Sequence, residues 1–256
     1  MKKILMLGSS HSAAYKSVEA ESLGLEIHIA ANSDGNLFKN LCIDSDGTLS
    51  LSKQAEAWDK KVWQYSLNAS TAKINAYDFL IMNIRWNYDL PQAVHGDNCD
   101  LINYYLNILT PSMQKYLISD QYFSVNGSRQ TLQLVEKLVR QTGFSKEKIL
   151  ICPEPFSTFP RQCISKPQTL SAKNKIRQIL EKYIPALIAE RTELRFLLPS
   201  FEMLENGFFV HHRYYPYGES GSNWNNLINN TCIVDRKHKN SSYASDLLSA
   251  NIGLFL

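Results

Sequence analysis

The segment that most constrains the fold is Lys2–Ser12, in which an apolar run ends at a glycine followed by serines. Ile4 to Leu7 form a continuous apolar run that predicts a buried strand, and Gly8 marks its end. A strand that feeds a helix through a tight turn places side chains at the carboxyl end of a parallel sheet, where ligands bind. The first helical turn also presents backbone N–H groups that lack partners within the helix. Ser10 is therefore a candidate nucleophile, and the alternative is that these serines only form a turn that caps a helix.

Apolar strand patterns alternate with helical patterns along most of the chain. This order predicts an α/β fold, a three-layer α/β/α sandwich with a mainly parallel sheet. A helix from Lys53 to Tyr65 is an alternative to an irregular insertion. The other expected strands are Leu25–Ala31, Tyr77–Ile84, Lys148–Cys152 and Leu194–Leu198, and the expected helices are Ser12–Leu23, Ser128–Thr142, Ser171–Ala189 and Ser241–Ile252.

Length and composition predict one globular domain. The 256 residues are 44% hydrophobic and 20% charged, which is enough apolar material for one substantial core. We expect residues 1–256 to form a single α/β domain, with less regular insertions around residues 37–76, 89–127 and 202–231. A net charge of +3 without a basic block gives no reason to expect nucleic acid as a partner.

Targeting signals are also absent from the sequence pattern. The apolar run after Met1–Lys3 is too short for a signal peptide, and no stretch reaches the ~18 apolar residues of a membrane span. We therefore expect a cytoplasmic protein without a membrane span.

Neither the cysteines nor the glycines indicate a cofactor or metal. The five cysteines show no C-x-x-C spacing, which argues against a disulfide framework or a zinc site. The glycine fingerprints of nucleotide-binding α/β proteins are missing after the first strand. His211 and His212 remain a rival base or metal pair, or solvated loop residues. Aromatic residues from Tyr214 to Trp224 could stack on a sugar or simply cover the sheet.

Four polar residues are expected at the same edge of the sheet. Ser10 follows the first strand, Asn87 follows the strand that ends at Ile84, and Asp235 and His238 precede the last helix. A serine hydroxyl needs an adjacent base to act as a nucleophile, and histidine accepts a proton near neutral pH. A carboxylate bound to the other ring nitrogen fixes the histidine tautomer. An amide such as that of Asn87 can stabilise an oxyanion.

These residues resemble the sequence blocks of the SGNH (GDSL-like) hydrolases and acyltransferases, in particular the polysaccharide-related members. Gly8–His11 is similar to the Gly-Asp-Ser block, which is often followed by histidine in those members. Arg85–Tyr88 holds the place of the Gly-x-Asn-Asp block, with Asp78 opening the preceding strand. Asp235–Tyr243 is similar to the final D-x-x-H block. The resemblance runs from residue 4 to residue 252 in block order, with the connecting segments unmatched.

The resemblance implies a flavodoxin-like SGNH fold and assigns roles to single residues. Ser10 would be the nucleophile, His238 the base and Asp235 the residue that orients it. Asn87 and the backbone N–H groups of Ser10 and Gly35 would form the oxyanion hole.

Three positions depart from the family pattern. Ser9 replaces an Asp or Asn, Arg85 replaces a glycine, and Tyr88 replaces an Asp. Arg85 could instead contact an anionic substrate or donor, and His11 and Trp86 are further candidate substrate contacts.

The function implied is serine-dependent O-acyl ester chemistry, by an esterase or an O-acetyltransferase, on a carbohydrate or glycan precursor. Expected partners are a small-molecule or glycan ester and, for transfer, an acyl donor; no cofactor is expected. The alternative is a catalytically impaired protein of the same fold that binds or assembles glycans. The sequence does not indicate an oligomeric state.

Overall fold

The computed structural model describes residues 1–32, 40–84, 128–153, 194–205, 209–214, 223–231 and 239–256. The helix expected at Ser171–Ala189 and the insertion expected at 89–127 lie outside the described residues.

The core of the described fold is a five-stranded sheet in which every pair of neighbouring strands is parallel. The predicted α/β fold with a mainly parallel sheet is thereby confirmed. The strand order is β2-β1-β6-β7-β8, so β1 has β2 on one side and β6 on the other. The strands are β1 (Lys2–Gly8), β2 (Leu25–Ala31), β6 (Phe79–Ile84), β7 (Ile149–Pro153) and β8 (Arg195–Phe196).

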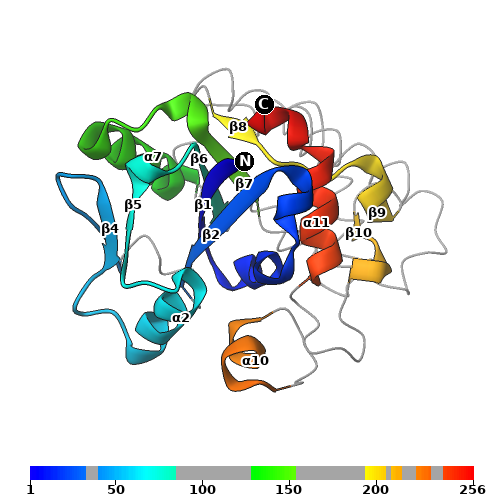
Figure 1. The fold of residues 1–256 in the computed structure, drawn as a ribbon, viewed down its shortest axis with the longest axis horizontal. Helices are drawn as coiled ribbons and strands as arrows, with labels where there is room; N and C mark the ends of the chain where they lie inside the picture. Colours follow the sequence, from blue (N-terminus) through cyan, green and yellow to red (C-terminus); the bar gives the residue numbers. More distant parts are fainter. Residues whose placement is uncertain (33–39, 85–127, 154–193, 206–208, 215–222, 232–238) are drawn as a thin grey trace, which may run out of the picture.

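Both faces of this sheet are covered, which explains the continuous apolar run of β1. Leu5 and Leu7 belong to a core shared with helix α7 (Ser128–Thr142). Ile4 and Met6 point the opposite way, into a core shared with helix α11 (Ser241–Ala250). Figure 1 shows α7 and α11 on opposite sides of the sheet.

The connection between β1 and β2 differs from the expected helix Ser12–Leu23. It consists of two 3₁₀ helices, η1 (Ser10–Ser17) and η2 (Ala20–Leu23), separated by an extended Val18. Ser12 donates both its amide (3.1 Å) and its hydroxyl (2.6 Å) to the carbonyl of Ser9, three residues earlier, which is the 3₁₀ spacing. The predicted stop at Gly24 is confirmed, because Gly24 caps η2 in the left-handed conformation with φ = 73°.

The region 40–76 contains a small antiparallel sheet that the sequence did not indicate. Its strands are β3 (Leu41–Ile43), β4 (Thr48–Leu51) and β5 (Thr71–Lys73). Helix α2 (Ala57–Leu67) lies between β4 and β5 and packs on β2, which confirms a helix in this insertion. The short 3₁₀ helix η3 (Ile74–Ala76) leads toward β6.

Helix α7 has the predicted bounds and ends before Gly143, whose φ is 67°. None of the helices in the described part of the chain is long and apolar enough to cross a membrane. The short elements are η4 (Lys146–Lys148), η7 (Phe201–Met203), β9 (Leu204–Glu205), β10 (Phe209–Val210), η8 (His212–Tyr214), α10 (Trp224–Asn229) and η9 (Ile252–Phe255).

Candidate functional site

The turn at the end of β1 is closely packed around Gly8. A Cβ atom on Gly8 would lie 2.3 Å from Ser12 Cβ and 2.5 Å from Ser12 Oγ, closer than any side chain tolerates. Glycine is therefore required because η1 folds back over the end of its own strand. The amide of Ser9 donates to the carbonyl of Asn83 (3.1 Å), and the amide of Asn32 donates to that of Gly8 (2.9 Å). The end of β1 is thus held by both neighbouring strands.

The two serines of this turn have different roles. Ser9 is buried (4% exposed), and its hydroxyl caps η1 by accepting from the amide of His11 (3.4 Å). Ser10 is the first residue of η1 and is partly exposed. Within the described part of the chain, neither the amide nor the hydroxyl of Ser10 makes a hydrogen bond. The hydroxyl of Ser9 is used as a helix cap, whereas Ser10 presents a backbone N–H and a hydroxyl at the carboxyl edge of the sheet.

A buried polar cluster lies at the same edge, between β6, β7 and η1. Asn83 Nδ2 donates to the carbonyl and to Sγ of Cys152, each at 3.4 Å. The Tyr15 hydroxyl lies 3.3 Å from the same Sγ, which ties η1 to β7. Burial raises the pKa of Tyr15, and Cys152 raises it further, so this phenol stays neutral. The cluster fixes the platform beneath η1.

Helix α10 closes one side of the turn. Asn223 caps this helix by accepting from the amide of Asn226 (2.8 Å). The buried Trp224 donates its indole N–H to the carbonyl of Ser9 (3.4 Å). Figure 1 shows α10 at the end of the molecule toward which β1 runs. Trp224 and Tyr214 are 2% and 0% exposed, so neither can serve as the considered sugar-stacking platform.

Helix α11 begins beside η1. The two elements pack against each other, and Tyr243, in the first turn of α11, is close enough to Tyr15 to contribute to raising its pKa. Asn240 caps α11, because its side chain accepts from the amide of Tyr243 (3.1 Å). The chain therefore reaches Asn240 on the side of the sheet that carries η1.

The described residues include only part of the predicted site. Ser10 and His11 lie in η1, as described above. Residues Gly35, Arg85, Trp86, Asn87, Asp235 and His238 lie outside the described residues.

The structure does describe the residues that directly precede Arg85 and directly follow His238. Arg85 directly follows β6, whose last residues pair with the end of β1. His238 directly precedes Lys239, which is buried (2% exposed) at the start of the α11 region. Both chain segments therefore start or end at positions that the described structure fixes.

The described structure includes the side chain of His211, one member of the histidine pair, but not that of His212. Among them, no group of three His, Cys, Asp or Glu side chains is arranged to hold a metal ion. His211 is exposed, and its Nδ1 accepts from the amide of Arg213 (3.2 Å), which is a local structural contact.

Sequence reasoning missed the polar cluster of Asn83, Cys152 and Tyr15. The available signal was Asn83 itself, a single polar residue in the apolar strand Phe79–Ile84. Its partners are distant in sequence, so only the fold brings them together.

The geometry offers a hydroxyl and a backbone donor on one residue, at the edge of a parallel sheet where ligands bind. This combination suits a nucleophile whose own amide helps to hold an oxyanion. Comparisons with known proteins find no matching family model, no matching curated protein and no matching solved structure.

Proposed function

We propose that this protein carries out serine-dependent O-acyl ester chemistry, with Ser10 as the nucleophile. One observation carries the proposal: Ser9 is buried as the cap of η1, while Ser10 is partly exposed and has an unengaged amide and hydroxyl among the described residues. A serine kept only for the fold would be expected to use its hydroxyl, as Ser9 does.

In the proposed reaction Ser10 Oγ attacks the acyl carbonyl carbon and His238 accepts the hydroxyl proton. Asp235 orients His238 and stabilises its charged form. The amide of Ser10, with the amide of Gly35 and the side chain of Asn87, stabilises the oxyanion. Collapse of this intermediate expels the alcohol, which takes the proton from His238.

The acyl group on Ser10 is then transferred to an acceptor. Water as the acceptor makes the protein an esterase, and a sugar hydroxyl makes it an O-acetyltransferase. His11, Arg85 and Trp86 are the proposed substrate contacts, and Arg85 would favour an anionic glycan or donor.

The fold supports this proposal without identifying the family. Counted along the chain, β1, β2, β6, β7 and β8 are the first to fifth strands of this sheet. Their order in space, β2-β1-β6-β7-β8, is then 2-1-3-4-5, the order of flavodoxin-like sheets. In that order the crevice lies between the carboxyl ends of β1 and the third strand, here β6. Ser10 follows β1 and Arg85 to Asn87 follow β6, as a flavodoxin-like SGNH α/β/α sandwich requires.

The experiment is labelling with a fluorophosphonate probe, followed by fragmentation of the tryptic peptide Ile4–Lys16. This peptide contains Ser9, Ser10 and Ser12, and fragmentation distinguishes them. We expect the adduct on Ser10 and its loss in Ser10→Ala. Ser17→Ala is the matched control, because Ser17 is exposed at the far end of the same 3₁₀ helix.

Absence of labelling, or equal labelling of Ser10→Ala, would overturn the nucleophile assignment and leave the glycan-binding alternative. If Ser10 is labelled, hydrolysis of p-nitrophenyl acetate with and without sugar acceptors separates the two reactions. An esterase releases acetate in both cases, whereas an acetyltransferase forms the acetylated sugar.

A further inference from the structure

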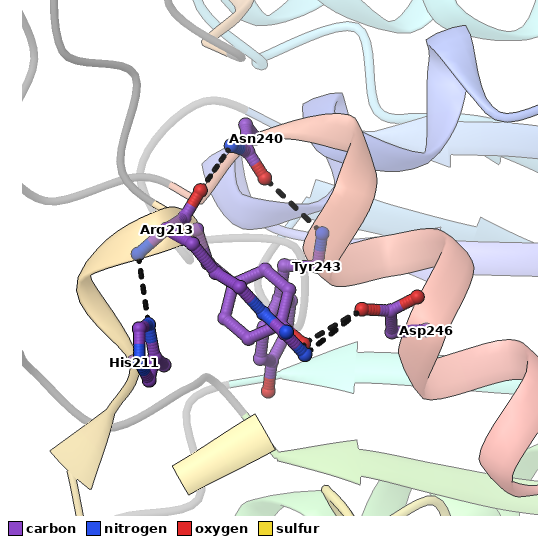
Figure 2. A network of polar contacts seen from close by, with 6 residues as sticks. His211, Arg213, Asn240, Tyr243 and Asp246 are labelled. Carbon is purple, nitrogen blue, oxygen red and sulfur yellow. Dashed lines mark hydrogen bonds and ion pairs between the residues drawn. The ribbon is translucent and has the colours of Figure 1, made fainter. Parts of the chain in front are cut away.

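A network of polar contacts joins η8 to the beginning of α11 (Figure 2). Asp246 accepts a hydrogen bond from the hydroxyl of the buried Tyr214 (2.7 Å). It also forms an ion pair with Arg213, whose Nη2 lies 3.5 Å from Asp246 Oδ2. The Arg213 guanidinium also lies 4.7 Å from the centre of the Tyr214 ring. The Tyr214 ring packs edge-on against Tyr243 at 5.5 Å. These contacts fix the backbone of Arg213 and Tyr214 relative to α11.

Asn240 attaches the preceding chain to this fixed backbone. Its amide donates to the carbonyl of Tyr214 (2.9 Å), and its side-chain Nδ2 donates to the carbonyl of Arg213 (3.0 Å). Its Oδ1 accepts from the amide of Tyr243 (3.1 Å). A helix cap needs only the last of these contacts. The first two hold Asn240 to η8, which Figure 2 shows on the opposite side of the residue from α11.

His238 is two residues before Asn240, and two extended residues span at most about 7 Å. The contacts of Asn240 therefore fix one end of the short chain segment that leads to His238. Catalytic groups lose effect steeply with misplacement, by about 100-fold for 1 Å.

We propose that Asn240 is a positioning residue, whose hydrogen bonds to η8 hold the segment carrying His238 in register with Ser10. The inference rests on the proposed function, since it assigns to His238 the role of base. It adds that η8, through Arg213, Tyr214 and Asp246, is the anchor of that segment.

The variants separate the tether from the cap. Asn240→Asp keeps a side-chain oxygen for the amide of Tyr243 and loses the donor to the carbonyl of Arg213. Asn240→Ala loses both contacts. Tyr214→Phe keeps the ring and loses the hydrogen bond to Asp246. Ser242→Ala is the control, because Ser242 is exposed in the same helical turn.

The assay is p-nitrophenyl acetate turnover, with the rate of fluorophosphonate labelling at Ser10 as a second readout. We expect Asn240→Asp and Asn240→Ala each to lower kcat about tenfold or more with KM unchanged, as a loss confined to the transition state requires. Tyr214→Phe should lower kcat less, and Ser242→Ala not at all. Labelling should slow in parallel with kcat.

A second series repeats Asn240→Asp in a His238→Ala background. If Asn240 acts through His238, the substitution should have no further effect there, because the residue it positions is gone. An equal loss in both backgrounds would show a merely structural role and overturn the inference. Wild-type kcat in Asn240→Asp would overturn it as well.

The two proposals fail in different ways. If wild-type protein is not labelled at Ser10, or if His238→Ala is labelled at the wild-type rate, the proposed function is wrong and the inference falls with it. If wild type is labelled and His238→Ala is labelled much more slowly, while Asn240→Asp behaves as wild type, only the inference is wrong.

Discussion

Gly8→Ala tests whether the close approach of η1 to the end of β1 shapes the serine turn. The added methyl would lie 2.3 Å from Ser12 Cβ, about 1.2 Å short of an ordinary carbon–carbon contact of about 3.5 Å. Both atoms are bonded directly to the backbone, so no rotamer change relieves the overlap. We expect a loss of about 3 kcal/mol in the free energy of unfolding, at the upper end of overpacking costs.

The size of the effect should depend on Ser12. Ser12→Ala keeps the overlapping Cβ, so Gly8→Ala should cost nearly the same in that background. Ser12→Gly removes the overlap. It costs about 2 kcal/mol itself through the glycine and the lost hydrogen bond to Ser9, but Gly8→Ala should then cost under about 1 kcal/mol.

Urea denaturation measures these free energies of unfolding. The proteins compared are the wild type, the single variants Gly8→Ala, Ser12→Gly and Ser12→Ala, and the two double variants that combine Gly8→Ala with each Ser12 substitution. The predicted coupling between Gly8→Ala and Ser12→Gly is about 2 kcal/mol in the compensating direction. Strictly additive effects would refute the packing argument. So would a Gly8→Ala protein as stable as the wild type.

Three further predictions concern stability. Ser9→Ala should lower the free energy of unfolding in urea titrations by about 1 kcal/mol, because it removes a helix cap. Ser10→Ala should lower it by less than about 0.5 kcal/mol, and a larger loss for Ser10→Ala than for Ser9→Ala would contradict the roles assigned to the two serines. Gly24→Ala should cost about 1 kcal/mol through the left-handed backbone alone, since no atom lies within 4 Å of the added methyl, and Gly24→Asn should cost less. The hydrogen bond from His28 and the nearby Lys3 hold the pKa of Glu26 below its ordinary 4.5, so its stabilising contribution is present above that pH and lost as pH falls through the lowered value. Glu26→Gln should accordingly weaken the fall in thermal stability below pH 4.5, and an unchanged pH dependence would count against this ion pair.

Elements with a long pattern and a clear stop were predictable from sequence. Leu25–Ala31 and Ser128–Thr142 have the expected bounds, because strand alternation and a helical stripe each run uninterrupted to a boundary residue. The segment after Ser10 was predicted as one helix and is two 3₁₀ turns. Its serines bond to backbone three residues away, a local preference that periodicity does not register.

The small sheet of β3, β4 and β5 was not predictable, because β3 and β5 have only three residues each and β5 pairs with β4 across more than 20 residues. The same limit applies to the site. The sequence indicates Ser10 through the strand and glycine before it. Only the cap geometry of η1 shows that Ser9 and Ser10 have different roles. Only the register between β6 and β7 shows that Asn83 lies beside Cys152.

Every step of the proposed reaction depends on acylation of Ser10. The most direct measurement is rapid acid quenching after mixing with p-nitrophenyl acetate, with the peptide Ile4–Lys16 analysed by fragmentation. We expect a nitrophenolate burst of about one equivalent when deacylation is slow, and an acetyl group on Ser10. Turnover with the acetyl group on another residue, or turnover unchanged in Ser10→Ala, would contradict it.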